Sequence, residues 1–441
     1  MAAGKGRRTP STTFPRLLRR NRNYRYTWLG QIVSEIGDHF NTIAVFSLVL
    51  ERTGSGLVVS GIMLARAVPM ILAGPIAGVL LDRMDRKQIM LWSDLMRAIV
   101  AVLFVFAVGR DDTWLLYLLS GLLMFASPFF TSGRTAILPT IASREELHTA
   151  NSLTQTTKYA TVTIGTLLGG TSAAHFGYEA AFLLNAASFV FSAVMVWKLH
   201  LENGSFRPPK RALTETDVAR PWHEYREGLA YLRGVPLLFA ISLVHVGWAT
   251  GGGAAQILFS LFGEIVFNRG AMGIGLIWSA AGVGLLIGAA VAHRMGETIP
   301  YDNYKATIWI CYLIHGTSYV LFSQAESFWM ALVFIALSRA SVAVSSVLNQ
   351  MQLLRHVPDT FRGRVFSTIE SMTWATMMLS LTAAGVASES YSPRTIGVWA
   401  GAISGLTAIG WFWANWRNAL PEPAERGIDP DELEVRAQPR M

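Results

Sequence analysis

Apolar segments long enough to cross a lipid bilayer recur twelve times along this chain. The predicted spans cover residues 26–50, 56–81, 88–109, 114–139, 147–174, 179–199, 236–263, 271–292, 304–323, 327–350, 363–387 and 395–416. A helix needs roughly 20 residues to cross a hydrocarbon core about 30 Å thick. Backbone groups in lipid must be hydrogen-bonded internally, and barrel strands would be shorter and would alternate. We therefore expect an all-α integral membrane protein.

The composition supports this class. The chain is 52% hydrophobic and 15% charged, whereas a soluble domain carries about 25% charged residues. A net charge of +8 is compatible with nucleic-acid binding, but the cations lie between the apolar segments, as membrane topology requires. The single cysteine, Cys311, lies within a span. A disulfide within one chain and a cysteine metal cluster are thereby excluded, and we expect a buried, inert thiol.

The distribution of cations predicts the orientation in the membrane. Alternate loops and the N-terminal tail are rich in lysine and arginine, whereas the opposite loops hold only Arg52, Arg110, Arg269 and Arg394. Because cytoplasmic loops carry the excess of cations, both termini are predicted to be cytoplasmic. The expected location is the bacterial inner membrane.

One long polar interruption, residues 201–235, separates the spans into two groups of six. The predicted organisation is a basic tail over 1–25, a helical bundle over 26–200, this linker, a second bundle over 236–416, and a polar tail over 417–441. In the linker, helical spacing of Trp222, Tyr225, Leu229 and Leu232 predicts an amphipathic helix on the membrane surface. A plain solvated linker is the alternative.

The loop between the second and third spans has a distinctive pattern, Gly78-Val-Leu-Leu-Asp82-Arg83-Met-Asp85-Arg86-Lys87. It resembles the signature loop of the major facilitator superfamily. Four more segments resemble the branch of that superfamily with enterobactin and macrolide exporters: Gln31–Asp38, Arg134–Pro139, the linker helix and Pro358–Phe366. The resemblance implies twelve transmembrane helices in two six-helix bundles, and secondary active transport by alternating access.

The resemblance also implies a cytoplasmic gate. In the family, the counterpart of Asp82 contacts the start of the eleventh span, which here begins beside Arg362 and Arg364. A carboxylate is stabilised at a helix N-terminus, so these contacts would hold the cytoplasmic side closed and set the balance between the two access states. The residues predicted to form this gate are Gly78, Asp82, Arg83, Arg86, Asp94, Arg97, Arg362 and Arg364.

The first span carries a polar stripe made by Gln31, Ser34, Glu35, Asp38, Asn41 and Thr42. At 100° per residue these side chains share one side of the helix, facing the bundle interior. Asp38 would lie ~18 Å into the membrane, where a carboxylate in low dielectric can bind a proton. We predict that Asp38, supported by Glu35, couples transport to protons. The alternative is a packing carboxylate paired with a cation such as Lys158, Arg134 or Arg66.

Other intramembrane side chains are candidates for a substrate cavity. Arg66 and Arg339 lie well inside their spans, so each must form an ion pair or face water. In the seventh span, Trp248 and Gln256 flank three consecutive glycines, Gly251–Gly253. This run is either a flexible break or a site of close helix packing.

These residues predict a secondary transporter that exports a small amphipathic molecule, drug-like or siderophore-like, by proton antiport. One alternative is a facilitator of the same fold that moves lysophospholipids, metabolites or anions. The other is a membrane sensor or assembly partner that transports nothing. No nucleophile–base pair or metal-ligand spacing is recognisable, so neither enzymatic activity nor a cofactor or metal is expected. The expected partners are the substrate, protons and the bilayer, not nucleic acid, and the chain is expected to be a monomer.

Overall fold

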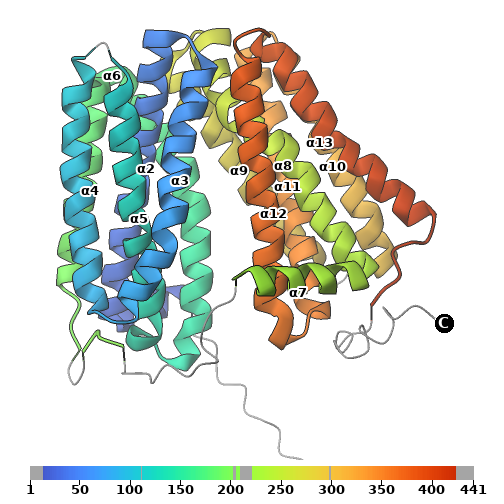
Figure 1. Cartoon of the computed structure of the whole chain (residues 1–441), viewed down its shortest axis with the longest axis horizontal. Helices are drawn as coiled ribbons and strands as arrows, with labels where there is room; N and C mark the ends of the chain where they lie inside the picture. The colour runs from blue at the N-terminus through green and yellow to red at the C-terminus, as the bar shows by residue number, and fades with distance from the viewer. Residues whose placement is uncertain (1–12, 111, 202–204, 209–220, 297–298, 424–441) are drawn as a thin grey trace, which may run out of the picture. The chain divides into compact units, whose positions relative to one another are not determined.

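The computed structural model describes residues 13–110, 112–201, 205–208, 221–296 and 299–423, and in these residues every regular element is helical (Figure 1). The helices are α1 (Phe14–Arg20), α2 (Arg22–Thr53), α3 (Gly56–Leu81), α4 (Arg86–Val108), α5 (Trp114–Ile141), α6 (Arg144–Trp197), α7 (Pro221–Gly234), α8 (Pro236–Leu261), the π-helix η2 (Phe262–Val266), α9 (Gly270–Gly296), α10 (Tyr301–Gln324), α11 (Phe328–His356), α12 (Asp359–Ala387) and α13 (Pro393–Trp416).

Nine helices in the described part of the chain are long and apolar enough to cross a membrane. One of the nine is α6, which holds two of the predicted spans. The more polar α2 and α12, with 32 and 29 residues, match the first and eleventh predicted spans. The prediction of an all-α protein with twelve spanning segments is confirmed.

Helix α6 is a hairpin. A straight helix of 54 residues would extend ~80 Å, far more than a bilayer. Both ends of α6 instead lie beside the start of α2, because Asn21 Nδ2 donates to Glu146 Oε2 (3.1 Å) and Asn23 Nδ2 donates to the His200 carbonyl (2.8 Å). The reversal occurs at Gly177, whose φ of 84° and ψ of 169° are open only to glycine.

The described chain divides into two compact units. The first contains Met1–Leu48 and Ile62–Arg211. Within it α4 packs against α5 and α6, and α2 packs closely on α6. A Cβ atom at Gly37 would collide with the Ser188 side chain, and one at Gly169 would press on the backbone of His39 and Phe40.

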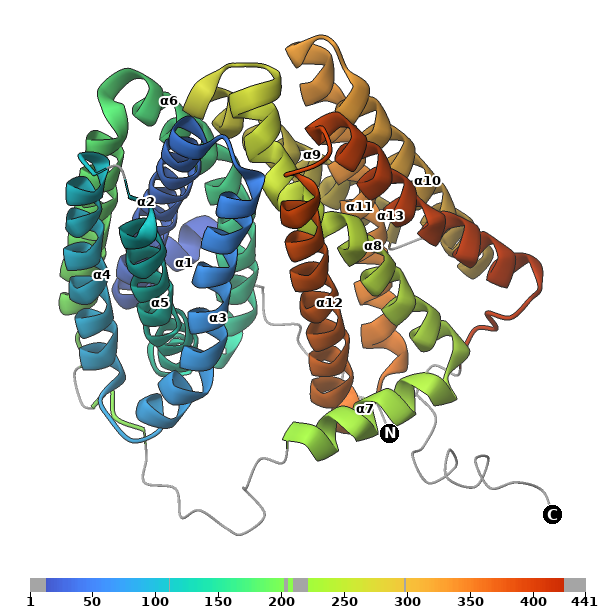
Figure 2. The same cartoon turned by 45° about the horizontal axis from the view of Figure 1, so that its top comes forward.

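The second unit contains Val49–Gly61 and Ala212–Met441. Here α8 packs against α12 and α13, α10 against α11 and α13, and α9 against α11. Helix α7 crosses the ends of α8 and α12 (Figure 2) and buries Tyr231 and Leu232, while Trp222 is 71% exposed. A helix is therefore present where an amphipathic one is predicted. Its position on the membrane surface stays a prediction, as do the predicted boundaries of the two tails and the linker.

Large apolar side chains cover the outer surface of individual helices. On α4, Trp92, Ile99 and Phe106 follow one another at seven-residue intervals and are 72%, 63% and 67% exposed. Such a continuous apolar face is unfavourable in water and suited to lipid acyl chains. This surface agrees with a membrane-spanning bundle.

The glycine run of α8 is part of an uninterrupted helix, and all three glycines are buried. A Cβ at Gly253 would collide with the Met377 carbonyl and a Cβ at Gly251 with the Ala400 carbonyl. At Gly252 a Cβ would make ordinary van der Waals contacts, with the Trp248 ring at 3.4 Å and Met377 Cε at 3.5 Å. Of the two alternatives for this run, the structure favours close packing of α8 against α12 and α13.

The variant Gly253→Ala is accordingly expected to destabilise the protein by about 1–3 kcal/mol, because α8 and α12 must separate to admit the methyl group. Gly252→Ala is the matched control, and its effect is expected to lie between neutral and ~1 kcal/mol stabilising, since alanine favours helix more than glycine does. Thermal unfolding of both purified variants in the same detergent measures the difference. Equal melting temperatures would contradict the packing role.

Candidate functional site

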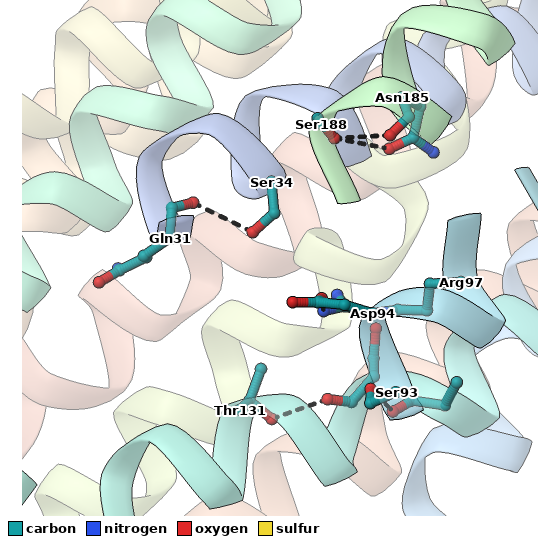
Figure 3. Close-up of polar contacts among 10 residues, drawn as sticks. Gln31, Ser34, Ser93, Asp94, Arg97, Thr131, Asn185 and Ser188 are labelled. Atoms are coloured by element: carbon teal, nitrogen blue, oxygen red, sulfur yellow. Dashed lines mark hydrogen bonds and ion pairs between the residues drawn. The ribbon is translucent and has the colours of Figure 1, made fainter. Parts of the chain in front are cut away.

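The polar stripe of α2 faces the interior of the first unit. Gln31, Ser34 and Asn41 are almost fully buried, and Glu35 and Asp38 are partly buried. Figure 3 shows Gln31 and Ser34 on α2 together with polar residues of α4 and α6. The neighbouring α6 contributes the fully buried Asn185 and the hydroxyl groups of Ser188 and Ser192. A polar interior of this kind is retained in a membrane protein where it lines a pathway or fixes helices together.

Asp38 has an unsatisfied carboxylate. Its Oδ1 atom is buried and makes no hydrogen bond with any described residue. Four charged side chains act on it electrostatically: Arg97 and Arg66 attract its negative charge, and Glu35 and Asp94 repel it. A buried carboxylate oxygen without a donor is costly, and a bound proton would relieve both the missing hydrogen bond and the repulsion.

Glu35 differs from Asp38 because both of its oxygens accept hydrogen bonds. Gln31 Nε2 donates to Oε1 at 2.8 Å, and the Thr161 hydroxyl donates to Oε2 at 2.7 Å. Arg134 is the cation that interacts with Glu35 electrostatically. Glu35 therefore fixes α2 to α6. Asp38 Oδ1 and Asp94 Oδ2 are the buried carboxylate oxygens without a donor among the described residues, and Asp94 differs in that its other oxygen is paired with Arg97.

Arg66 reaches from α3 to α2. Its Nη1 donates to Asn41 Oδ1 at 3.1 Å and its Nη2 donates to the Thr42 hydroxyl at 2.9 Å. Both partners are neutral, so the guanidinium keeps its full charge and acts on Asp38 without a direct ion pair. Arg66 thus interacts with Asp38, the candidate proton site, through space. This differs from the predicted ion pair, in which the two side chains would be in direct contact.

Asp94 and Arg97 form an ion pair inside the first unit, 0% and 2% exposed (Figure 3). The Arg97 guanidinium also lies against two aromatic rings, with its Cζ 4.7 Å from the Phe130 centroid and 4.4 Å from the Phe189 centroid. Since α4 begins at Arg86, Asp94 lies ~12 Å along the helix. The two residues predicted to extend the gate thus lie in the interior of the first unit, where both interact electrostatically with Asp38.

The signature loop is attached to its own unit. Asp85 caps α4 by accepting from Gln88 N at 3.1 Å. Arg86 Nη1 donates to the Ala136 carbonyl of α5 at 2.8 Å, and Lys87 Nζ donates to the Leu199 carbonyl beyond α6 at 2.7 Å. Asp82 and Arg83 are exposed. Gly78 lies in α3, where a Cβ would meet no atom within 4 Å.

The predicted partners of that loop belong to the second unit. Arg362 Nη2 donates to the Leu354 carbonyl at 3.0 Å. Arg364 Nη1 forms an ion pair with Glu227 Oε2 of α7 at 3.2 Å, and its guanidinium lies 5.0 Å from the Phe361 ring centroid. A contact of either arginine with Asp82 stays a prediction.

Among the predicted cavity residues of the second unit, Trp248 has a polar atom without a hydrogen-bond partner in the described chain. The Trp248 Nε1 atom is buried and has no acceptor among the described residues. Gln256 is partly buried in the same helix. Arg339 of α11 is 8% exposed, with its Cζ 5.1 Å from the Phe259 ring centroid.

Several contacts of the site are absent from the sequence-based prediction. Thr161 binds Glu35, Phe130 and Phe189 enclose Arg97, and Glu227 pairs with Arg364. The only signal for Glu227 was its place in the predicted linker helix. In the part of the chain that the structure describes, no three His, Cys, Asp or Glu side chains form a group that could hold a metal ion.

The apolar outer surface, the twelve spanning segments and the charged interior together define a multi-pass membrane protein. The model of the Major Facilitator Superfamily matches residues 27–336, more than two thirds of the chain. The chain belongs to this superfamily, whose members are transporters and not enzymes.

Curated relatives include efflux proteins. The chain is 27% identical over 370 residues to the uncharacterized MFS-type transporter YfiS of Bacillus subtilis, covering 81% of this chain and 85% of the relative. It is 26% identical to the multidrug efflux pump Tap of Mycolicibacterium fortuitum, over 79% and 85% of the two chains. It is 24% identical to macrolide efflux protein A of Streptococcus pyogenes, over 80% and 86%.

Solved structures share the fold at lower sequence identity. A bacterial homologue of the human lysosomal transporter Spinster superposes with a TM-score of 0.68 at 14% identity, over 90% of this chain and 97% of the other. A bacterial homologue of the iron transporter ferroportin gives a TM-score of 0.66 at 17% identity, over 88% and 98%. These similarities establish the architecture alone.

Proposed function

We propose that this transporter exports a small amphipathic compound in exchange for protons, by alternating access, with both termini in the cytoplasm. The observation that carries the proposal is the Asp38 carboxylate, buried in the membrane-spanning part of the first unit with one oxygen that accepts no hydrogen bond. Both oxygens of Glu35 accept hydrogen bonds, and Asp94, whose Oδ2 also lacks a donor, forms a direct ion pair with Arg97, whereas the Asp38 side chain forms neither with any described residue. An unsatisfied carboxylate is suited to bind and release a proton in each cycle.

The charges around Asp38 give protonation a consequence. The described interior of the first unit holds three arginines, Arg66, Arg97 and Arg134, which interact with Asp38, Asp94 and Glu35 respectively. With all six ionised the set is neutral. A proton on Asp38 leaves one excess positive charge and removes the attraction that holds Asp38 towards Arg66 and Arg97. We infer that this change of attraction is what shifts the balance between access states.

Efflux as the direction of transport is supported by the names of two relatives, the multidrug efflux pump Tap and macrolide efflux protein A. The test is transport into inside-acid proteoliposomes of a panel with a macrolide, a cationic dye and an amphipathic carboxylate. We expect at least one compound to accumulate with the gradient and not without it. Accumulation that is equal with and without a pH gradient would contradict proton coupling.

The gate proposal concerns Asp82, whose exposed carboxylate is free to make contacts beyond its own unit. Asp82→Asn is expected to favour the inward-open state by weakening attraction to the arginines at the start of α12. The readout is alkylation of a cysteine introduced at Thr154, which lines a polar pocket of about 30 Å³ with Tyr24 and Gln31. Labelling from the cytoplasmic side should become several-fold faster.

The matched control for that experiment is Arg83→Gln, a neutralisation at the neighbouring exposed position. The native Cys311 is buried and is replaced by serine in all variants. If Asp82→Asn and Arg83→Gln label at the same rate as the parent protein, Asp82 does not hold the gate.

A further inference from the structure

The buried charges of the second unit are not balanced. Arg339 is 8% exposed in the middle of α11, and among the described residues no carboxylate forms an ion pair with it. The first unit is different, because its arginines Arg66, Arg97 and Arg134 each interact with an acidic side chain. A cation buried without a counter-charge is strongly unfavourable, so its retention calls for a negative charge from outside the described chain.

Near Arg339, two buried polar groups of the described chain also have no hydrogen-bond partner. The ring of Phe259 contacts both the Arg339 guanidinium, at 5.1 Å, and the ring of Trp278, at 5.0 Å between centroids. Tyr319, 2% exposed, interacts electrostatically with Arg339. The Trp278 Nε1 and Tyr319 Oη atoms are both buried and make no hydrogen bond with a described residue. A buried donor without an acceptor is rarely tolerated.

His315 is also close to Arg339 and does not supply the missing charge. Its Nδ1 lies 2.7 Å from the Ser338 hydroxyl and its Nε2 lies 2.9 Å from the Ser404 hydroxyl, so both ring nitrogens already have partners. The hydrogen bonds fix the ring and position the helices around it. Around Arg339 and the Phe259 ring, the described residues therefore offer one cation and two donors without acceptors, and no negatively charged acceptor.

We propose that Arg339, Trp278 and Tyr319 form a subsite for the anionic group, a carboxylate or a phosphate, of the transported compound. A guanidinium binds such oxygens through paired hydrogen bonds, and indole N–H and phenol O–H groups complete their coordination. The inference rests on the proposed function in that it requires transport of a small amphipathic compound. It narrows that compound to an amphipathic anion.

Equilibrium binding to the purified full chain in non-ionic detergent tests the subsite without any proton gradient. The probe is 11-(dansylamino)undecanoic acid, with its uncharged methyl ester as the matched ligand, detected by energy transfer from tryptophan. The parent protein should bind the acid about tenfold or more tightly than the ester, the ratio expected for a charge-assisted pair. Arg339→Gln should bind the two ligands equally.

Arg269→Gln is the control variant, because Arg269 also lies over an aromatic ring, Phe328 at 4.8 Å, but is exposed. It should keep the preference for the acid. Equal affinity of the parent protein for acid and ester, or no binding of either, overturns the proposal. Displacement of the acid by phosphatidylglycerol in an Arg339-dependent manner would assign the subsite to a lipid headgroup and would overturn the assignment to a transported compound.

A second measurement separates recognition from a structural role. Arg339→Met removes the unpaired charge, so the ligand-free melting temperature should be unchanged or higher, while stabilisation by the acid is lost. A large fall in melting temperature would show that Arg339 is needed for folding and would overturn the proposal. Since Asp38→Asn leaves this subsite intact, that variant should still prefer the acid even if proton coupling proves absent.

Discussion

Asp38→Asn is expected to abolish pH-driven accumulation of substrate without unfolding the protein. One pH unit corresponds to about 1.4 kcal/mol per proton, so one-for-one exchange supports about a tenfold accumulation ratio for each pH unit of gradient. An amide is close to the carboxylate in shape but cannot carry the proton, so the ratio should fall to about one.

The measurement uses proteoliposomes with an imposed pH gradient and the membrane potential clamped by potassium and valinomycin. Glu35→Gln is the matched control, since both Glu35 oxygens already accept hydrogen bonds from Gln31 and Thr161. Glu35→Gln should lower the free energy of unfolding while leaving most of the accumulation ratio. Gradient-driven accumulation by Asp38→Asn at the parental level would refute proton coupling at this residue.

Breaking the Asp94–Arg97 pair should produce the largest loss of stability in the molecule. Removing one partner leaves an uncompensated charge in an interior where both side chains are almost inaccessible, at a cost of about 3–5 kcal/mol. The variants are Asp94→Leu and Arg97→Met. The double variant should recover most of the loss, because a pair of apolar side chains carries no desolvation cost.

The unfolding free energies of the parent protein, the two single variants and the double variant form a double-mutant cycle. The cycle isolates the interaction energy between Asp94 and Arg97. The stability of Arg97→Lys should lie between that of the parent protein and that of Arg97→Met. Lysine keeps the charge but lacks the planar group that lies against Phe130 and Phe189. Asp112→Asn is the surface control: its pair with Arg110 is about half exposed and should contribute less than about 1 kcal/mol. Single variants as stable as this control would contradict the prediction.

The sequence was sufficient to predict what depends on local hydrophobicity. Spanning length and the absence of alternation predict helices, and the twelve-span prediction is confirmed with α2 and α12 included. The helical spacing of polar residues also predicts the stripe that includes Asp38. These inferences succeed because a bilayer imposes length and polarity on each helix separately.

The contacts that give the site its properties depend on distant residues. Their position after the signature loop predicts that Asp94 and Arg97 extend the gate, whereas the structure buries both side chains about two helical turns into α4, in the first unit. Their aromatic neighbours come from α5 and α6, and no local pattern distinguishes such rings from ordinary core residues. The imbalance around Arg339 likewise becomes visible only once every carboxylate near it can be excluded.

The turn at Gly177 has a mechanical consequence. A single glycine separates the two arms of α6, so the connection between them cannot lengthen, although rotation about the Gly177 backbone can still change the angle between the arms. The two arms must therefore stay together at this end, and the arm that contacts Glu35 through Thr161 is joined there to the arm that holds Phe189 against Arg97. The candidate proton site and the buried ion pair thus contact two arms of one helical hairpin, and a rotation at Gly177 would change the distance between them.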